Sequence, residues 1–98
     1  MLHFYVPAYV LIEISQLDKK GKCQLSRPIR EWASDLFSFS TFVLAPLDAS
    51  VAIRYDEMSF TTDPADALIV ATALQLDLPL ITNDSHIHAT KPCLLYWD

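Results

Sequence analysis

Three acidic residues, Glu13, Asp66 and Asp84, stand where carboxylates can do chemistry. Asp66 falls in the first turn of a helix predicted from Pro64 to Leu76. Asp84 comes just after a short apolar strand predicted from Pro79 to Thr82. A helix runs antiparallel to the strand it leads into in a right-handed crossover, so the helix start and the strand end share one edge of the sheet. We therefore expect Asp66 and Asp84 to lie at the same edge.

Glu13 lies early in another predicted helix, between the apolar residues Ile12 and Ile14. A carboxylate in so apolar a segment is costly if left unpaired, so it should have a partner or a metal. Clustered carboxylates repel one another, and a hard divalent cation with oxygen ligands resolves that repulsion. The three acids therefore predict a Mg²⁺ or Mn²⁺ site, which can activate a water for phosphodiester cleavage.

Each acid also has a purely structural interpretation. Asp66 can close a capping box with Asp63, the expected N-cap of its helix. Asp84 can be an ordinary turn residue after a strand. Glu13 can extend its carboxylate to solvent or pair with a lysine, although its apolar neighbours disfavour this. These alternatives stay open at the level of the residues alone.

The residues with softer ligand atoms do not predict a second site. His86 and His88 form an H-x-H pair with no third soft ligand nearby, which favours surface turn residues over a zinc site. Cys23 and Cys93 are too few and too far apart in sequence to form a disulfide framework, which is typical of a reducing cytosol.

Length and composition set the class of protein. The chain has 98 residues, of which 52% are hydrophobic, enough for a single domain over residues 1–98 with a real core. The net charge of −5 argues against free, tight nucleic-acid binding through a basic face, but allows a nuclease whose acids gather at a metal site. The apolar N-terminal segment is too short and too interrupted to span a membrane and has no basic start. We expect a cytoplasmic protein without a membrane or targeting segment.

Strands and helices alternate along the chain, which predicts an α/β fold with a mainly parallel sheet. The predicted elements are a strand at Leu2–Val6, a helix from Ala8 to about Lys20 closed by Gly21, a helix capped by Ser26, a strand at Phe42–Leu47, a helix capped by Asp48, the helix Pro64–Leu76, the strand Pro79–Thr82, a turn at Ser85–Ala89 and a strand at Leu94–Trp97.

The segment from Asp63 to Asp84, DPADALIVATALQLDLPLITND, resembles the C-terminal signature of PIN domains, in particular that of VapC-like toxins from bacterial toxin–antitoxin pairs. Upstream, VPAYVLIEISQLDKKGKCQLSRPIREW resembles the family's strand and glutamate-bearing helix, and FVLAPLDASVAIR fits the strand and helix that follow. The resemblance covers nearly the whole chain and is most specific from Asp63 to Asp84.

The resemblance implies a three-layer α/β fold, with a mainly parallel sheet flanked by helices, and a metal-dependent ribonuclease. By motif position, Glu13, Asp66 and Asp84 are implied to be catalytic and to bind Mg²⁺ or Mn²⁺, with Glu13 positioning or deprotonating the attacking water. Thr82 is implied to orient Asp84 through its hydroxyl. The implied partners are an RNA substrate, a cognate antitoxin and a second copy of the chain in a homodimer.

One departure from the family pattern concerns its first acid, which lies on an opening strand in a segment like D-T-H-x-L-L-W. The chain starts too late to include this segment, so we expect the domain to lack the family's first β-strand and its aspartate. Three explanations stay open: a shorter protein, residues that precede Met1, or a second chain that fills the gap. A true absence would weaken metal binding and impair activity.

Three functions therefore compete. The first is a metal-dependent endoribonuclease of a toxin–antitoxin system, its activity impaired if the first strand is absent. The second is a non-catalytic PIN remnant that binds an antitoxin or itself through its abundant apolar residues. The third is a small α/β domain whose acids serve only as helix caps.

Overall fold

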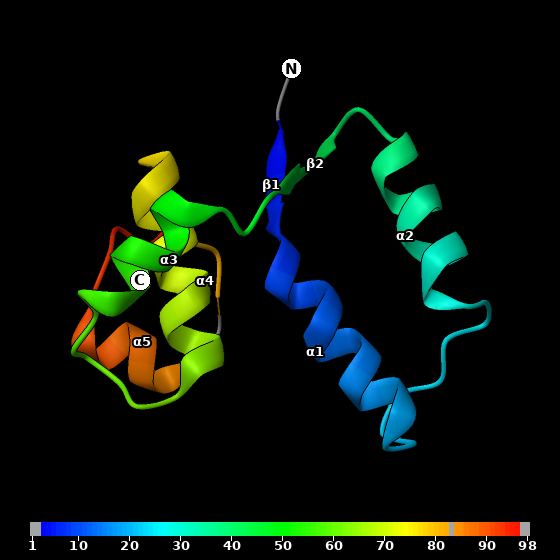
Figure 1. Ribbon diagram of the computed structural model, residues 1–98, viewed down its shortest axis with the longest axis horizontal. Coiled ribbons are helices and arrows are strands. Elements are labelled where there is room, and N and C mark those ends of the chain that lie inside the picture. Colours follow the sequence, from blue (N-terminus) through cyan, green and yellow to red (C-terminus); the bar gives the residue numbers. More distant parts are fainter. Residues whose placement is uncertain (1–2, 83, 97–98) are drawn as a thin grey trace. The chain divides into compact units, whose positions relative to one another are not determined.

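The computed structural model describes residues 3–82 and 84–96. The chain divides into two compact units, Met1–Pro46 and Leu47–Asp98 (Figure 1). The single domain predicted for residues 1–98 stays a prediction, because two compact units can together make up one domain. No helix within the described residues is long and apolar enough to cross a membrane.

The first unit is a two-stranded parallel sheet with two helices in the connection between its strands (Figure 1). Its elements are β1 (Phe4–Pro7), α1 (Ala8–Lys19), α2 (Ile29–Ser38) and β2 (Phe42–Ala45). Phe4 pairs with Phe42 and Pro7 with Ala45, and the rings of Phe4 and Phe42 lie 6.2 Å apart between centroids. The predicted α/β class and the parallel pairing of these strands are confirmed, while Leu2 lies outside the described residues.

The boundaries of α1 follow from local chemistry. Pro7 ends β1 and stands at the N-cap of α1, where its missing N–H costs no hydrogen bond. Lys19 lies in the last turn of the helix, where its charge complements the helix dipole. Gly21 has a φ of +74°, and nothing lies within 4 Å of a Cβ built on it. The backbone conformation, rather than a lack of space, therefore favours glycine at this stop.

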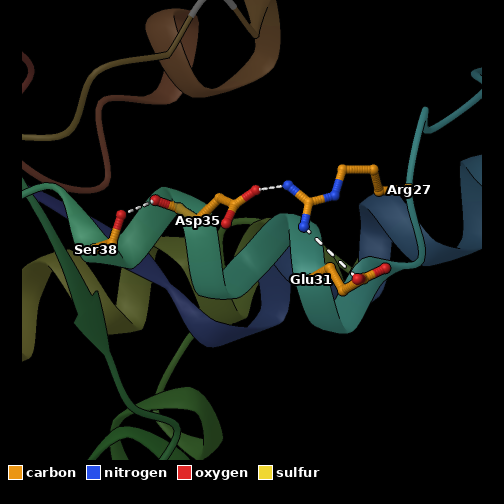
Figure 2. Close-up of polar contacts among 4 residues, drawn as sticks. All are labelled: Arg27, Glu31, Asp35 and Ser38. Atoms are coloured by element: carbon orange, nitrogen blue, oxygen red, sulfur yellow. Dashed lines mark hydrogen bonds and ion pairs between the residues drawn. The ribbon is translucent and has the colours of Figure 1, made fainter.

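The prediction that Ser26 caps the second helix is wrong. Pro28 is the N-cap of α2, and its carbonyl accepts from the N–H groups of Glu31 and Trp32, each at 3.0 Å. Ser26 is two residues too early to reach these groups. The side chain that reaches this helix from the preceding connector is Arg27: Figure 2 shows its guanidinium between Glu31, at 3.6 Å, and Asp35. Both partners are about half exposed, so this contact adds little stability.

The second unit is helical and contains most of the buried core. Its helices are α3 (Ala49–Asp56), α4 (Pro64–Leu76) and α5 (Ser85–Thr90). α3 packs against α4, whose residues 71–73 are all buried, so α4 is covered on more than one side. This explains why α4 is apolar nearly all round. The buried hydrophobic residues of this unit are Val51, Ala67, Val70, Ala71, Ala73 and Ile87.

Two predicted strands of the second unit, Pro79–Thr82 and Leu94–Trp97, are wrong as strands. Within the described residues they meet in one parallel bridge between Leu80 and Leu95. The Leu80 N–H donates to the Leu94 carbonyl and the Leu80 carbonyl accepts from the Tyr96 N–H, both at 2.9 Å. The pairing extends no further because the next backbone groups on this side are engaged elsewhere: the Leu78 N–H donates to the Ala73 carbonyl, and the Thr82 carbonyl accepts from His88 of α5. Trp97 lies outside the described residues.

Candidate functional site

Two turns of the same type lead into α4 and α5. The sequence T-x-D occurs at Thr61–Asp63 and again at Thr82–Asp84. In each turn the aspartate N–H donates to the threonine Oγ1 two residues earlier, at 3.1 Å. Each aspartate is then the N-cap of the helix that follows, so the two turns present two carboxylates in the same local setting.

Capping engages one carboxylate oxygen of each aspartate. Asp63 Oδ1 accepts from the Ala65 N–H at 2.9 Å, and Asp84 Oδ1 accepts from the Ile87 N–H at 2.9 Å. The Thr82 hydroxyl therefore acts on the Asp84 backbone, while the carboxylate itself is oriented by α5. These bonds fix the direction of each side chain and leave its second oxygen, Oδ2, available to another ligand.

Asp66 lies in the first turn of α4 and is half-buried. Burial raises the pKa of the Asp66 carboxyl, and the negative charges of Asp63 and Asp84 raise that pKa further, while His86 acts in the opposite direction. These effects require the three carboxylates to lie within electrostatic range of one another. Asp66 does not close a capping box, because the Asp63 N–H donates to Thr61 instead.

This group of carboxylates has the chemistry that a hard divalent cation requires. All the donors are oxygens, and their mutual repulsion adds to burial in raising the pKa of Asp66. A Mg²⁺ or Mn²⁺ ion would relieve that repulsion while keeping several of its own waters. The oxygen donors of these residues are therefore of the kind that such a metal binds. The sequence had marked Asp63 only as a helix cap, and the signal that could have added it to the site is the repeated T-x-D.

Glu13 lies within α1, half-buried, in the first unit, whereas Asp66 and Asp84 belong to the second. Among residues 3–82 and 84–96, no three His, Cys, Asp or Glu side chains lie close enough together to hold a metal ion. The structure thus brings Asp66 into range of Asp84, and the part of Glu13 stays a prediction from its motif position.

Both histidines of α5 lie within hydrogen-bond distance of a backbone carbonyl. His86 Nε2 lies 3.0 Å from the Phe60 carbonyl, and His88 Nε2 lies 2.6 Å from the Thr82 carbonyl. Because a carbonyl only accepts, each Nε2 carries a proton and donates it. The ring of His86 also stacks on that of Phe60, with centroids 6.1 Å apart and planes 22° apart.

A pocket of about 180 Å³ opens beside the first of the two turns. Its lining residues are Tyr55, Asp56, Met58, Thr61, Thr62, Asp63 and Ala67. It therefore provides open space next to one of the carboxylates, within the second unit.

The raised pKa of Asp66 predicts how stability changes with pH. The folded protein holds the Asp66 proton more tightly than the unfolded chain, so this residue favours folding below its ordinary value of 3.8. That contribution is lost as the pH rises through the higher folded-state pKa. In chelator-treated protein, we expect Asp66→Asn to raise the thermal midpoint at neutral pH by a few degrees at most.

The same substitution should bring no gain near pH 3, where the Asp66 carboxyl is protonated in both states. Thermal unfolding followed by circular dichroism at both pH values checks this expectation. A gain of equal size at both would show that charge repulsion is not its cause.

Comparisons with known proteins bear on this site. The family model for the PIN domain matches residues 2–91 of the chain. Ribonuclease VapC22 of Mycobacterium tuberculosis (strain ATCC 25618 / H37Rv) is 32% identical over 87 residues, which make up 88% of this chain and 66% of that relative. The chain thus spans just under two thirds of the length of this relative. No solved structure matches the chain.

Proposed function

Because this chain belongs to the PIN domain family, we propose that it is a Mg²⁺- or Mn²⁺-dependent endoribonuclease that acts as the toxin of a toxin–antitoxin pair. The observations that carry this proposal are the family match over residues 2–91 and the placement of Asp66 in the first turn of α4, where the charge of the N-cap Asp84 of α5 acts on its carboxyl. The similarity to a relative named as a ribonuclease supports RNA as the substrate. The proposal extends to a cytoplasmic protein with a three-layer fold, a cognate antitoxin and a homodimeric state.

Asp66 and Asp84 are the proposed metal ligands and the proposed catalytic residues. Asp84 offers the carboxylate oxygen that its capping bond to Ile87 leaves available, and Thr82 holds the turn from which Asp84 projects. Glu13 is assigned to the same site on its motif position, with the role of orienting or deprotonating the attacking water. When bound, the metal supplies Lewis-acid stabilisation of the phosphodiester and a more acidic water.

Metal removal tests the proposal directly. We expect the full chain to cleave single-stranded RNA in the presence of Mn²⁺ or Mg²⁺, and to lose that activity by about 100-fold or more after treatment with a chelator. Adding back Mn²⁺ in excess should restore the activity. Ca²⁺ should restore it poorly, because it is larger and holds its ligands at longer distances. Cleavage that survives chelation would contradict a metal-dependent nuclease.

A second function, protein binding without catalysis, is favoured by the apolar surface of the first unit. Neither α1 nor α2 contains a buried residue. Among the described residues of this unit, the exposed large apolar side chains are Tyr5, Ile12, Leu17, Phe39 and Leu44. Size-exclusion chromatography coupled to light scattering, run alongside a Mn²⁺ titration, separates the two functions. A clean dimer that takes up no Mn²⁺ would favour the binding module.

A further inference from the structure

We propose that His86 is a positioning residue that ties the turn before α4 to the turn before α5 and so sets the spacing of the carboxylates. The proposal rests on the proposed metal site and adds to it a residue that touches no metal. It starts from the hydrogen bond between His86 and Phe60, which joins residues 26 positions apart in the sequence.

The two ends of this tie lie directly beside the two acidic turns. Phe60 immediately precedes Thr61, whose hydroxyl accepts from the Asp63 N–H. His86 lies in the first turn of α5, two residues after the N-cap Asp84. A single imidazole therefore connects the segment that presents Asp63 to the helix that orients Asp84.

Further contacts support this connection. The ring of His86 stacks on that of Phe60, and the Thr90 hydroxyl donates to the His86 backbone carbonyl at 2.8 Å within α5. α5 itself is anchored by Ile87, which is 2% exposed.

His88 acts on the second turn and not on the first. Its Nε2 donates to the carbonyl of Thr82, in the turn that leads into its own helix, so this bond spans only six residues. His88 thus stabilises one turn locally, whereas His86 joins the two turns. Since carboxylates that share a metal must be held to within about 0.5 Å of the geometry that binds it, loss of this connection should weaken metal binding.

Three variants test the role of His86. His86→Ala removes the donor, His86→Gln keeps an N–H that can reach the Phe60 carbonyl, and His3→Ala serves as a matched control. His3 makes the same kind of bond, from Nδ1 to the Ser40 carbonyl at 3.0 Å, in the other unit. The readouts are the Mn²⁺ dissociation constant from calorimetry and amide hydrogen exchange at Asp63 and Ala65 in metal-free protein.

We expect His86→Ala to weaken Mn²⁺ binding by about 10-fold or more and to speed exchange at both amides by about 10-fold. His86→Gln should keep most of the wild-type affinity, and His3→Ala should keep all of it. Thermal unfolding of His86→Ala should confirm that the chain still folds, because His86 is exposed. Wild-type affinity and wild-type exchange in His86→Ala would overturn the proposal and leave the proposed function intact.

Failure of the proposed function gives a different pattern. If the wild-type protein takes up no Mn²⁺, the metal site is refuted. The exchange measurement alone then decides whether His86 connects the two turns. Faster exchange in His86→Ala would then support His86 as the joint between the turns, and unchanged exchange would overturn it.

Discussion

Replacing either Asp66 or Asp84 by asparagine is expected to reduce Mn²⁺-dependent RNA cleavage by about 100-fold or more. Each substitution removes one negative charge and one strong oxygen ligand while keeping the shape of the side chain. In Asp84→Asn, the new amide would still offer an oxygen to the Ile87 N–H and would still cap α5, because asparagine is as good an N-cap as aspartate. Loss of activity in Asp84→Asn would therefore result from the missing negative charge and not from a change in the fold.

The matched control for these variants is Asp77→Asn. Asp77 ends α4 at its other terminus, with a φ of 55°, a conformation that asparagine adopts readily. This variant removes the same charge from the same helix at a distance from the acidic turns and should keep full activity. If Asp66→Asn and Asp84→Asn also keep full activity, the acids serve only as caps and turn residues, and the nuclease assignment fails.

The second large effect concerns Ile87, the buried residue of α5. Ile87 is 2% exposed, and replacing it with alanine should lower the free energy of unfolding by roughly 2–5 kcal/mol. The backbone N–H that donates to Asp84 is unchanged by this substitution, so the loss comes from apolar packing and the cavity left behind. Urea denaturation measured by circular dichroism gives the free energy directly.

Ile53→Ala is the control for Ile87→Ala, since Ile53 lies on α3 and is 64% exposed. It should change the free energy of unfolding by about 0.5 kcal/mol or less. Equal effects of the two substitutions would mean that α5 is not anchored through Ile87. In that case the rigid placement of Asp84 and His86 would lose its main support.

Sequence reasoning succeeded where structure is fixed by neighbours along the chain. The helix Pro64–Leu76 has the predicted bounds, because Asp63 caps its first turn, Pro64 suits its first position and Asp77 ends it in a left-handed conformation. Asp48 likewise caps α3 by accepting from the Val51 N–H. These signals act over three or four residues and can be read directly from the sequence.

The same reasoning failed where distant segments decide the outcome. A strand exists only through its partner, and Leu80 finds one in Leu95 for a single bridge. The apolar run before Thr82 is a sufficient signal for strand propensity but carries no information on where that pairing stops. The error at the start of α2 is instead a local one: the prediction placed the cap at Ser26, whereas Pro28 is the N-cap.

The candidate site shows the same division. The charge of Asp84 raises the pKa of Asp66, so the two lie within electrostatic range of each other, while their shared role in a site stays a prediction. Asp63 was missed as a third member because its capping role was a sufficient explanation of its position. The role of His86 could not be read from the sequence, because its partner Phe60 lies 26 residues away.

The central claim is that Asp66 and Asp84 together bind a divalent cation, and Mn²⁺ titration by isothermal calorimetry tests it most directly. The wild-type chain should show a saturable binding isotherm at neutral pH, which Asp77→Asn should reproduce. Asp66→Asn and Asp84→Asn should each abolish that isotherm or weaken it by about 100-fold. Identical isotherms for all four proteins, or no binding by the wild type, would contradict the claim.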